Sequence, residues 1–228
     1  MAVSTWAVLG VTVIMVTVAG VFDGHGAQAS AQAPHAHTSL KQPASASADS
    51  GAAPGGTVWH SGRDVATCGP VPASSGYVNP VAGDVLTGER IDQGVDYAGS
   101  GALTAIGAAR ITYVGTSQTG WPGAFIEYRL LDGPDAGCFI YYAEGITPTP
   151  GLHAGQTVPA GQLLANIIPG WSTGIELGWG AGDSTKTYAA KAGKWSASDD
   201  ADSIASEAGK RFSALIVSLG GPAGRVEG

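Results

Sequence analysis

The sequence predicts an all-β, mainly antiparallel domain, built as a β-sheet or sandwich, with a single helix near its C-terminus. Glycine accounts for 36 of the 228 residues and charged residues for only 13%, a composition that favours loop-rich β structure over a helix bundle. Short apolar runs rich in β-branched and aromatic residues follow one another, with turn residues between them. Near the C-terminus, apolar residues instead recur at helical spacing.

The expected strands occupy the middle of the chain. In "ARITYVGT", residues 109–116, Ile111 and Tyr113 alternate with their neighbours, so that successive side chains face opposite sides of a sheet. The runs "GAFIEYRLLDG" and "CFIYYAEG" flank "PDAG", and the resulting "DGPDAG" turn predicts a hairpin. Further strand-like runs are "GALTAI", "LHAGQTVPAGQLLANII" and "GIELGWG".

The last predicted element is a helix over residues 199–219. Acidic residues 199–200 at its start and basic residues 210–211 in its second half complement the helix dipole, and glycines 220–221 provide a stop. We expect this helix to pack on the sheet, the alternative being a helix that binds a partner, and we expect the tail "GPAGRVEG" to fray. The apolar residues at helical spacing are Ile204, Ala208, Phe212, Leu215, Ile216 and Leu219.

Composition divides the chain into segments. The uncharged apolar run Trp6–Phe22 precedes Ala-x-Ala patterns, so residues 1–33 are expected to be a signal peptide or, alternatively, a membrane anchor. Residues 34–57 consist mostly of Ala, Ser, Pro and Gly and predict a disordered linker. The β domain is expected at 58–196 and the C-terminal helix and tail at 197–228. Both alternatives for the first segment predict an extracytoplasmic location, either secreted or anchored to the membrane.

The charge balance and the cysteines agree with that location. The net charge is -7 and the 11 Lys and Arg residues form no basic run, so nucleic acid is not expected as a partner. Membrane attachment is expected only through the N-terminal segment. Cys68 and Cys138 are the two cysteines, and in an oxidising compartment such a pair is expected to form a disulfide, two buried thiols being the alternative.

The motifs from Arg90 to Trp179 resemble, in order, those of the LytM/lysostaphin-type zinc metallopeptidases, which cut the peptide cross-bridges of bacterial peptidoglycan. The family motif Arg-x-His-x-Gly-Val-Asp-Phe/Tyr corresponds to "RIDQGVDY", and Tyr-x-His to the "YAE" of "YYAEGI". The paired Gly-Gln turns correspond to "LHAGQTVPAGQLL", and Thr-Gly-x-His-x-His-Phe to "STGIELGW". The resemblance covers roughly ninety residues and implies a β fold of the LytM type, with duplicated hybrid motifs.

The resemblance also implies which side chains would form the site. The family's three zinc ligands correspond to Asp92, Asp96 and Gly178, and its catalytic histidines to Glu144 and Glu176. None of the positions that hold histidine in the family does so here, and the histidines of this chain are His25, His35, His37, His60 and His153. Zinc is poorly suited to what remains, because it favours imidazole and thiolate ligands and here the third position has no side chain.

Three interpretations of the site are open. The first is a catalytically inactive module that binds cell-wall peptidoglycan or a cell-envelope protein. Tyr142, Trp171 and Trp179 are expected to line its ligand groove, together with Trp121 and Tyr141, although core packing is the alternative for each.

The second interpretation is a hard-cation site. No cofactor is expected, but four converging carboxylates need a cation or donors to offset their repulsion, and oxygen ligands suit calcium better than zinc. The third is a hydrolase acting on the cell wall, either a divergent metallopeptidase or a glycosidase-like enzyme in which Glu144 and Glu176 form a catalytic carboxyl pair.

Overall fold

The protein is described here by a computed structural model that covers residues 67–183, 185–192, 194–201 and 204–227. The expected signal or anchor segment, the linker, the expected start of the β domain at residue 58 and four of the five histidines lie outside these residues. Within the described ranges, none of the helices combines the length and the apolar character that crossing a membrane requires.

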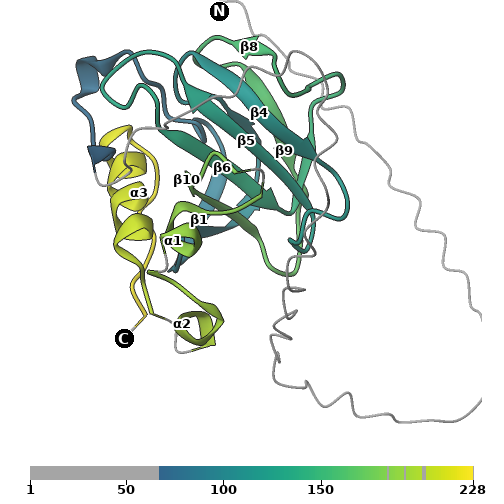
Figure 1. The fold of residues 1–228 in the computed structure, drawn as a ribbon, viewed down its shortest axis with the longest axis vertical. Coiled ribbons are helices and arrows are strands. Elements are labelled where there is room, and N and C mark those ends of the chain that lie inside the picture. The colour runs from purple at the N-terminus through teal and green to yellow at the C-terminus, as the bar shows by residue number, and fades with distance from the viewer. Residues whose placement is uncertain (1–66, 184, 193, 202–203, 228) are drawn as a thin grey trace, which may run out of the picture. The chain divides into compact units, whose positions relative to one another are not determined.

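Two antiparallel sheets form the domain (Figure 1). The seven-stranded sheet has the order β1-β2-β10-β6-β5-β4-β8, and the three-stranded sheet the order β3-β9-β7. The strands are β1 (Val85–Ile91), β2 (Val95–Ser100), β3 (Ala102–Thr104), β4 (Ala109–Gly115), β5 (Ala124–Leu130), β6 (Phe139–Glu144), β7 (Ile146–Pro148), β8 (Thr157–Val158), β9 (Leu163–Ile167) and β10 (Ile175–Gly180). The predicted fold class is confirmed, as is the hairpin, since β5 pairs with β6 in the antiparallel sense.

The two faces of the seven-stranded sheet differ. Along β10, Ile175, Leu177 and Trp179 belong to the main hydrophobic core, and Glu176 and Gly178 alternate with them and face the other way. The main core also includes residues of the three-stranded sheet and of the C-terminal helix. The opposite face carries a smaller buried cluster, formed by Phe125, Tyr141 and Ala143.

The C-terminal region contains separate helices instead of the single helix predicted for residues 199–219. The described elements are α1 (Tyr188–Lys191), α2 (Ala197–Ala201) and α3 (Glu207–Ser218). The N-cap of the long helix is Ser206, whose hydroxyl accepts a hydrogen bond from the backbone N–H of Gly209 at 2.9 Å. Ile204, placed on the apolar stripe by its spacing, is 49% exposed. Because Ser206 caps a helix within the stretch of apolar residues at helical spacing, α3 starts at Glu207 and not at residue 199.

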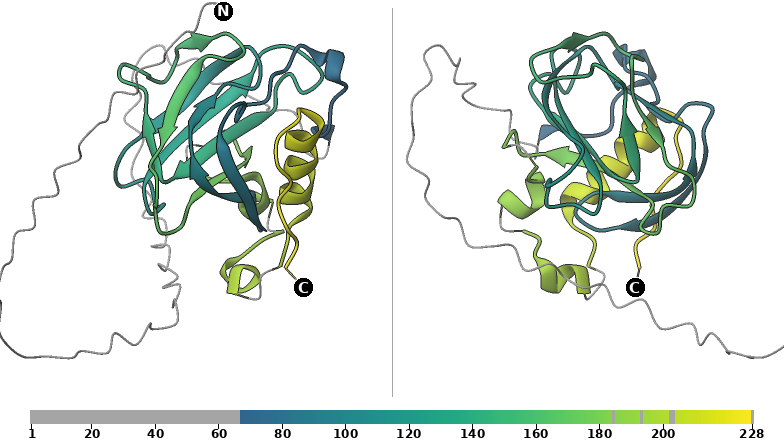
Figure 2. Two further views of the ribbon diagram at one scale, coloured as in Figure 1. Left: turned by 180° about the vertical axis from the view of Figure 1, so that it is seen from behind. Right: turned by 90° about the vertical axis from the view of Figure 1, so that its right-hand side faces the viewer.

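The expected packing and stop of this helix are confirmed. Figures 1 and 2 show α3 alongside the seven-stranded sheet, and its Phe212 ring meets the Trp179 ring edge-on, with the centroids 5.3 Å apart. The helix ends at Ser218, and its C-cap, Leu219, directly precedes the predicted glycines. The expectation of a frayed tail is wrong, because the N–H of Ile91 donates to the carbonyl of Arg225 at 2.8 Å. The tail thereby pairs with β1 as an isolated bridge.

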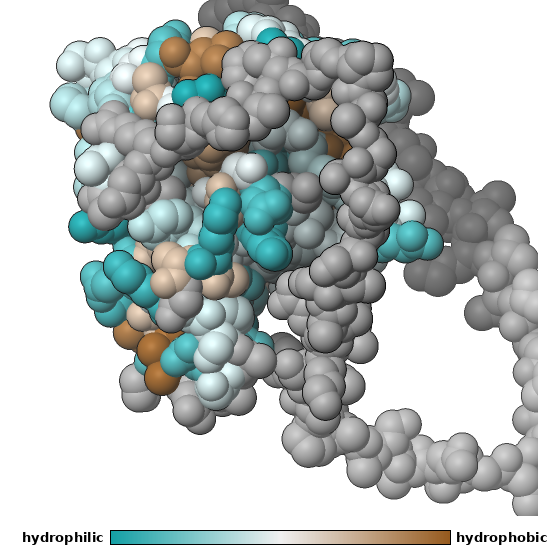
Figure 3. Space-filling model, in the orientation of Figure 1, coloured by the Kyte–Doolittle hydropathy of each residue, from teal (hydrophilic) through white to brown (hydrophobic). Residues whose placement is uncertain are grey.

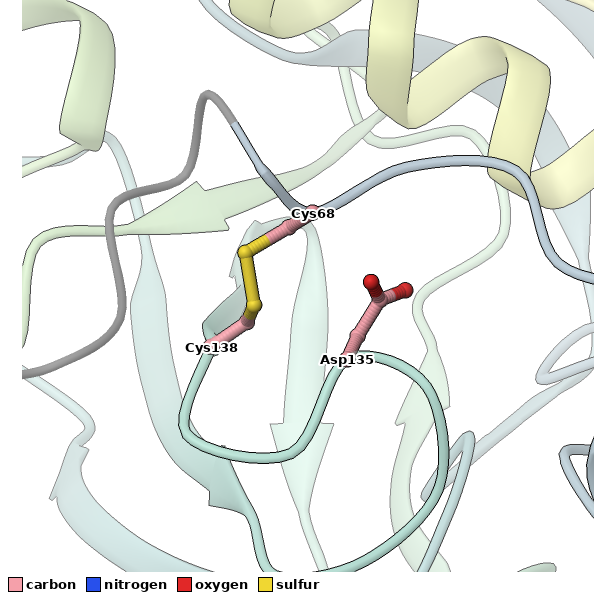
Figure 4. Close-up of side chains that lie close together, drawn as sticks. All are labelled: Cys68, Asp135 and Cys138. Carbon is pink, nitrogen blue, oxygen red and sulfur yellow. A yellow bond between two sulfur atoms is a disulfide. The ribbon is translucent and has the colours of Figure 1, made fainter.

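The predicted disulfide between Cys68 and Cys138 is present (Figure 4). It joins the segment before the first strand to the start of β6, across a sequence separation of 70. Asp135 lies beside it and accepts a hydrogen bond from the N–H of Gly69 at 3.2 Å. Because both sulfur atoms are used in the disulfide, this group of side chains is structural and offers no thiolate to a metal.

Exposed apolar side chains are scattered over the domain. On the face drawn in Figure 3, hydrophobic residues form spots separated by hydrophilic ones. The exposed large apolar residues among those described are Val78, Val85, Leu131, Trp171, Ile204, Val217 and Val226. Among the described residues visible in Figure 3, these spots do not join into one continuous apolar patch of the kind that marks a large protein interface.

Candidate functional site

Two neighbouring strands bring carboxylates together on the face opposite the main core. Glu176 of β10 lies directly across from Asp96 of β2 in the antiparallel register. Asp92 precedes β2 in the tight turn that joins it to β1. One carboxylate oxygen from each of these three residues lies within 4.8 Å of the others. With Glu144 at the end of β6, they form what we call the acidic cluster.

Asp92 is fixed by the turn and by the start of α3. Its Oδ1 accepts a hydrogen bond from the N–H of Gly94 at 2.9 Å, which holds the turn in shape. Its carbonyl oxygen accepts one from the N–H of Ser206, the N-cap of α3, at 2.8 Å. A Cβ at Gly209 would lie 2.6 Å from that same carbonyl oxygen, so only glycine lets the helix approach this closely. The side chain of Asp92 is consequently buried.

Arg90 supplies the positive charge of the site. Its Nη2 lies 3.0 Å from Oδ2 of Asp92 and 2.8 Å from Oδ1 of Asp200, and its Nε lies 3.4 Å from Oδ2 of Asp96. The guanidinium group therefore spans the turn, β2 and α2. Burial lowers the pKa of Arg90, but these three carboxylates raise it further, so the net shift is upward and the group stays charged.

Tyr141 fills the centre of the site. It lies on β6 opposite Gly178 of β10, and its hydroxyl donates a hydrogen bond to Oε1 of Glu176. Its ring stacks on Phe125, with the centroids 5.4 Å apart, and Trp121 packs against both rings. A Cβ at position 178 would lie 2.7 Å from the Tyr141 hydroxyl and from its ring. The space of a side chain at 178 is therefore occupied by tyrosine.

Glu144 lies where β6 ends. Its backbone has a φ of 76°, in the left-handed region that non-glycine residues rarely adopt. The side chain is buried, and its Oε2 has no hydrogen-bond partner in the part of the chain that the structure describes. Holding a glutamate in this conformation costs of order 1–3 kcal/mol, which the surrounding strand pairs must offset.

Burial raises the pKa of every member of the acidic cluster. For Asp96 it is raised to about 9, by burial and then by the charge of Asp92, with Arg90 opposing. For Glu144 it is raised to about 7, with burial as the largest cause. Burial also raises the pKa of Asp92, and it raises that of Glu176 well above its ordinary value, with the other carboxylates adding to the effect. The cluster therefore holds protons at neutral pH.

The ligand-groove prediction needs correction for two of its three aromatic residues. Tyr142 and Trp179 are completely buried in the main core and cannot offer a surface to a ligand. Tyr142 instead donates its hydroxyl proton to the carbonyl of Thr104 at 2.8 Å. Trp171, the third, is 36% exposed and packs over Gly145, next to Glu144 in the chain.

The structure also adds residues that the sequence did not single out. Arg90 begins the "RIDQGVDY" motif, so its place beside the two motif aspartates was open to inference. Asp200 is more than a hundred residues away and was assigned only to a helix start, and no sequence signal links it to Arg90. The one histidine among the described residues, His153, is exposed and contacts the carbonyl of Gly151.

The donor set does not fit zinc. Asp92, Asp96 and Glu176 offer oxygen alone, whereas zinc sites in proteins depend mainly on nitrogen and sulfur. Glu176, and not Gly178, is the third side chain that approaches the two aspartates. Oxygen ligands suit calcium chemically, but Arg90 already bonds both aspartates and Tyr141 already bonds Glu176. Internal donors thus take the place that a cation would have.

Comparison with known proteins gives structural matches only. No protein-family model matches the sequence, and no match is found among curated proteins. The chain is similar to a crystal structure of a protein from Pseudomonas aeruginosa assigned as an M23 peptidase (18% identity, TM-score 0.35, 49% of this chain and 48% of that one). It is also similar to the solution structure of lysostaphin (20%, 0.35, 46% and 46%).

A third similar structure is the crystal structure of CbpA from L. salivarius REN, at 16% identity and a TM-score of 0.35, over 67% of this chain and 90% of that one. The chain spans just under half the length of the first two structures.

Proposed function

We propose that this domain is a catalytically inactive, LytM-like module of the cell envelope that binds cell-wall peptidoglycan without cleaving it. Peptidoglycan is proposed as the ligand because the sequence motifs resemble those of enzymes that cleave it. One observation carries the loss of catalysis: the third zinc-ligand position is Gly178, and Tyr141 fills the space in which a ligand side chain would lie. An extracytoplasmic location belongs to the proposal and is supported by the Cys68–Cys138 disulfide, since such bonds persist in oxidising compartments.

The site's charges support binding over chemistry. The Arg90 guanidinium bonds the two aspartates that a metal would need, and each bond lowers the negative charge available to a cation. Glu144 and Glu176 stand where the family has its catalytic histidines, and burial raises the pKa of both, that of Glu144 to about 7. A pKa near 7 is compatible with acid–base catalysis, so the burial of these side chains, and not their protonation, opposes a catalytic role.

The same geometry argues against the hydrolase alternatives. A catalytic pair made of Glu144 and Glu176 would have to reach the scissile bond, but the exposed fractions of these residues are 9% and 2%. A divergent metallopeptidase would need three ligands and an open position for water. The hydroxyl of Tyr141 and the guanidinium of Arg90 instead occupy the carboxylate oxygens.

The surface that supports ligand binding lies beside the acidic cluster. Trp171 is the aromatic residue of the predicted groove that retains an accessible ring, at 36% exposure. It begins the turn in which the N–H of Gly174 donates to its carbonyl at 3.0 Å, so its backbone is held in place. An aromatic ring on a fixed backbone offers contact area to the apolar faces of a glycopeptide at a low cost in conformational entropy.

Co-sedimentation of the full chain with purified, protein-free sacculi tests this proposal. We expect the protein to pellet with the sacculi and the soluble fraction to gain no wall fragments. Trp171→Ala should weaken sedimentation roughly three- to tenfold, because a stacked aromatic contact contributes about 0.5–1.5 kcal/mol. Val85→Ala is the matched control, since Val85 is an exposed apolar residue, at 78%.

The outcomes separate the alternatives. Sedimentation only with sacculi that retain their proteins would identify an envelope protein as the ligand and reject direct wall binding. Release of soluble fragments by the wild-type chain, lost in Glu176→Gln, would show a carboxylate hydrolase. Circular dichroism melts of each variant distinguish a lost contact from a lost fold.

A further inference from the structure

A cavity of about 400 Å³ lies at the end of the seven-stranded sheet away from the acidic cluster. Its floor comes from β4, β5 and the start of β6, and the loop before β8 forms its wall. The lining residues are Arg110, Ile111, Thr112, Arg129, Leu131, Phe139, Ala154, Gly155 and Thr157. The volume lies in the range that holds a small organic ligand.

Two arginines lie side by side in the lining of this cavity. Arg110 of β4 pairs directly with Arg129 of β5 in the antiparallel register. Like charges directly opposite each other in a sheet are destabilising unless something between or beside them offsets the repulsion. None of the ion pairs found among the described residues involves Arg129.

Arg129 is also held in place for a ligand. Its guanidinium carbon lies 6.0 Å from the centre of the Phe139 ring, a cation–π contact that orients the planar group. Its Nε is buried and, within the described residues, has no hydrogen-bond partner. Because the Nε is shielded from the cavity, a ligand there would accept hydrogen bonds from the Nη groups of the guanidinium.

The remaining lining residues of the cavity indicate which chemical group would be attached to a bound anion. Leu131 and Phe139 contribute apolar side chains, and Thr112 and Thr157 add hydroxyl groups, whereas the Ile111 side chain is buried in the main core. An inorganic anion would leave that apolar surface unused. A planar carboxylate matches the fork of an arginine with two parallel hydrogen bonds, and an attached apolar group fills the remaining volume.

We propose that this cavity binds an organic carboxylate, with the carboxylate on Arg129 and Arg110 and its apolar portion against Leu131 and Phe139. Arg129 and Phe139 lie on the same face of the sheet as Tyr141, because residues two apart on a strand share a face and Arg129 pairs with Phe139. The site is thus separate from the acidic cluster but lies on the same face, and it goes beyond the proposed function.

Isothermal titration of the full chain with hexanoate, hexanamide and inorganic phosphate tests this proposal. We expect saturable binding of hexanoate, at least tenfold weaker binding of hexanamide, and phosphate binding weaker than that of hexanoate. Arg129→Gln should weaken hexanoate binding at least tenfold, because each charge-assisted hydrogen bond contributes more than the 1.4 kcal/mol that corresponds to tenfold. Arg225→Gln is the matched control, with the same charge change on an exposed residue outside the cavity.

A second variant keeps the test decisive if Arg129→Gln does not fold. Leu131 is 47% exposed at the edge of the cavity, so Leu131→Asp adds a repelling charge without disturbing the core, and it should weaken hexanoate binding at least threefold. Equal binding of hexanoate and hexanamide would overturn the proposal, as would phosphate binding as tight as that of hexanoate. No measurable hexanoate binding would overturn it as well.

Discussion

The Nη2 atom of Arg90 lies 3.0 Å from Oδ2 of Asp92, so two residues of the same sequence motif form an ion pair within the site. The same guanidinium reaches Asp96 and Asp200, so one arginine serves three carboxylates. A metal in this position would have to displace it. The carboxylates of the site are therefore neutralised by a side chain of the protein itself, without a metal ion.

Removing Arg90 is expected to destabilise the domain. Arg90→Met keeps much of the side chain's volume but leaves the aspartates without their counter-ion, which costs about 3–5 kcal/mol when a buried pair is broken. Arg90 is partly buried, with 20% of its side chain exposed, so the lower end of that range is expected. Urea unfolding at pH 7.5 measures the change.

Arg225→Met provides the control for that experiment, because it removes the same charge from an exposed side chain. A loss of stability in Arg90→Met no larger than in Arg225→Met would contradict the assigned role. The loss should also be smaller at pH 5 than at pH 8, since protonated carboxyl groups need less compensation.

Stability is expected to fall as the pH rises through the neutral range. Burial raises the pKa of Glu144 from 4.5 to about 7 and that of Asp96 from 3.8 to about 9 in the folded state. The folded chain then binds more protons than the unfolded chain above pH 4, so the free energy of unfolding decreases with pH until these groups ionise. Each excess proton gives a slope of about 1.4 kcal/mol per pH unit.

Unfolding of the wild type and Glu144→Gln between pH 4.5 and 9 measures this dependence. The variant cannot ionise at position 144, so its curve should be flatter between pH 4.5 and 7. Glu127 keeps part of the slope, because burial raises its pKa to about 7 although Thr112 and Gly182 donate hydrogen bonds to it. A stability that rises from pH 5 to pH 8 would rule out the assigned shifts.

The packing of Tyr141 on Gly178 is expected to appear as a coupling energy. Gly178→Ala places a methyl group 2.7 Å from the tyrosine ring and should cost about 1–3 kcal/mol through overpacking. In the background of Tyr141→Ala the same substitution should cost much less, because the space has been vacated. A double-mutant cycle gives the difference, and additive effects of the two substitutions would contradict the contact.

The sequence predicted the strands because alternation and turn residues are local signals, as in β5, β6 and the turn between them. It could not decide between Tyr141 and Tyr142 as the residue facing the site. Adjacent residues of a strand face opposite sides, and a shift of one residue in register exchanges them. That register is fixed by strand pairing with β10, which depends on the whole fold.

The C-terminal helix and the acidic cluster also depend on tertiary contacts that local sequence patterns do not reveal. The apolar period correctly located α3, but the N-cap at Ser206 depends on a contact with Asp92 far away in the chain. The convergence of Asp92, Asp96 and Glu176 followed from the resemblance between motifs. The contribution of Asp200 has no counterpart in those motifs, and a tertiary contact alone brings it to Arg90.

Our central proposal is that this site, whose sequence motifs resemble those of zinc peptidases, does not carry out zinc-dependent hydrolysis. Incubation of the full chain with dye-labelled sacculi and stoichiometric zinc, at pH 7.5, tests it most directly. We predict that dye release stays at the level of a sample without protein, and that the chain retains no zinc after gel filtration. Zinc-dependent dye release, abolished by a chelator and by Asp96→Ala, would contradict the claim.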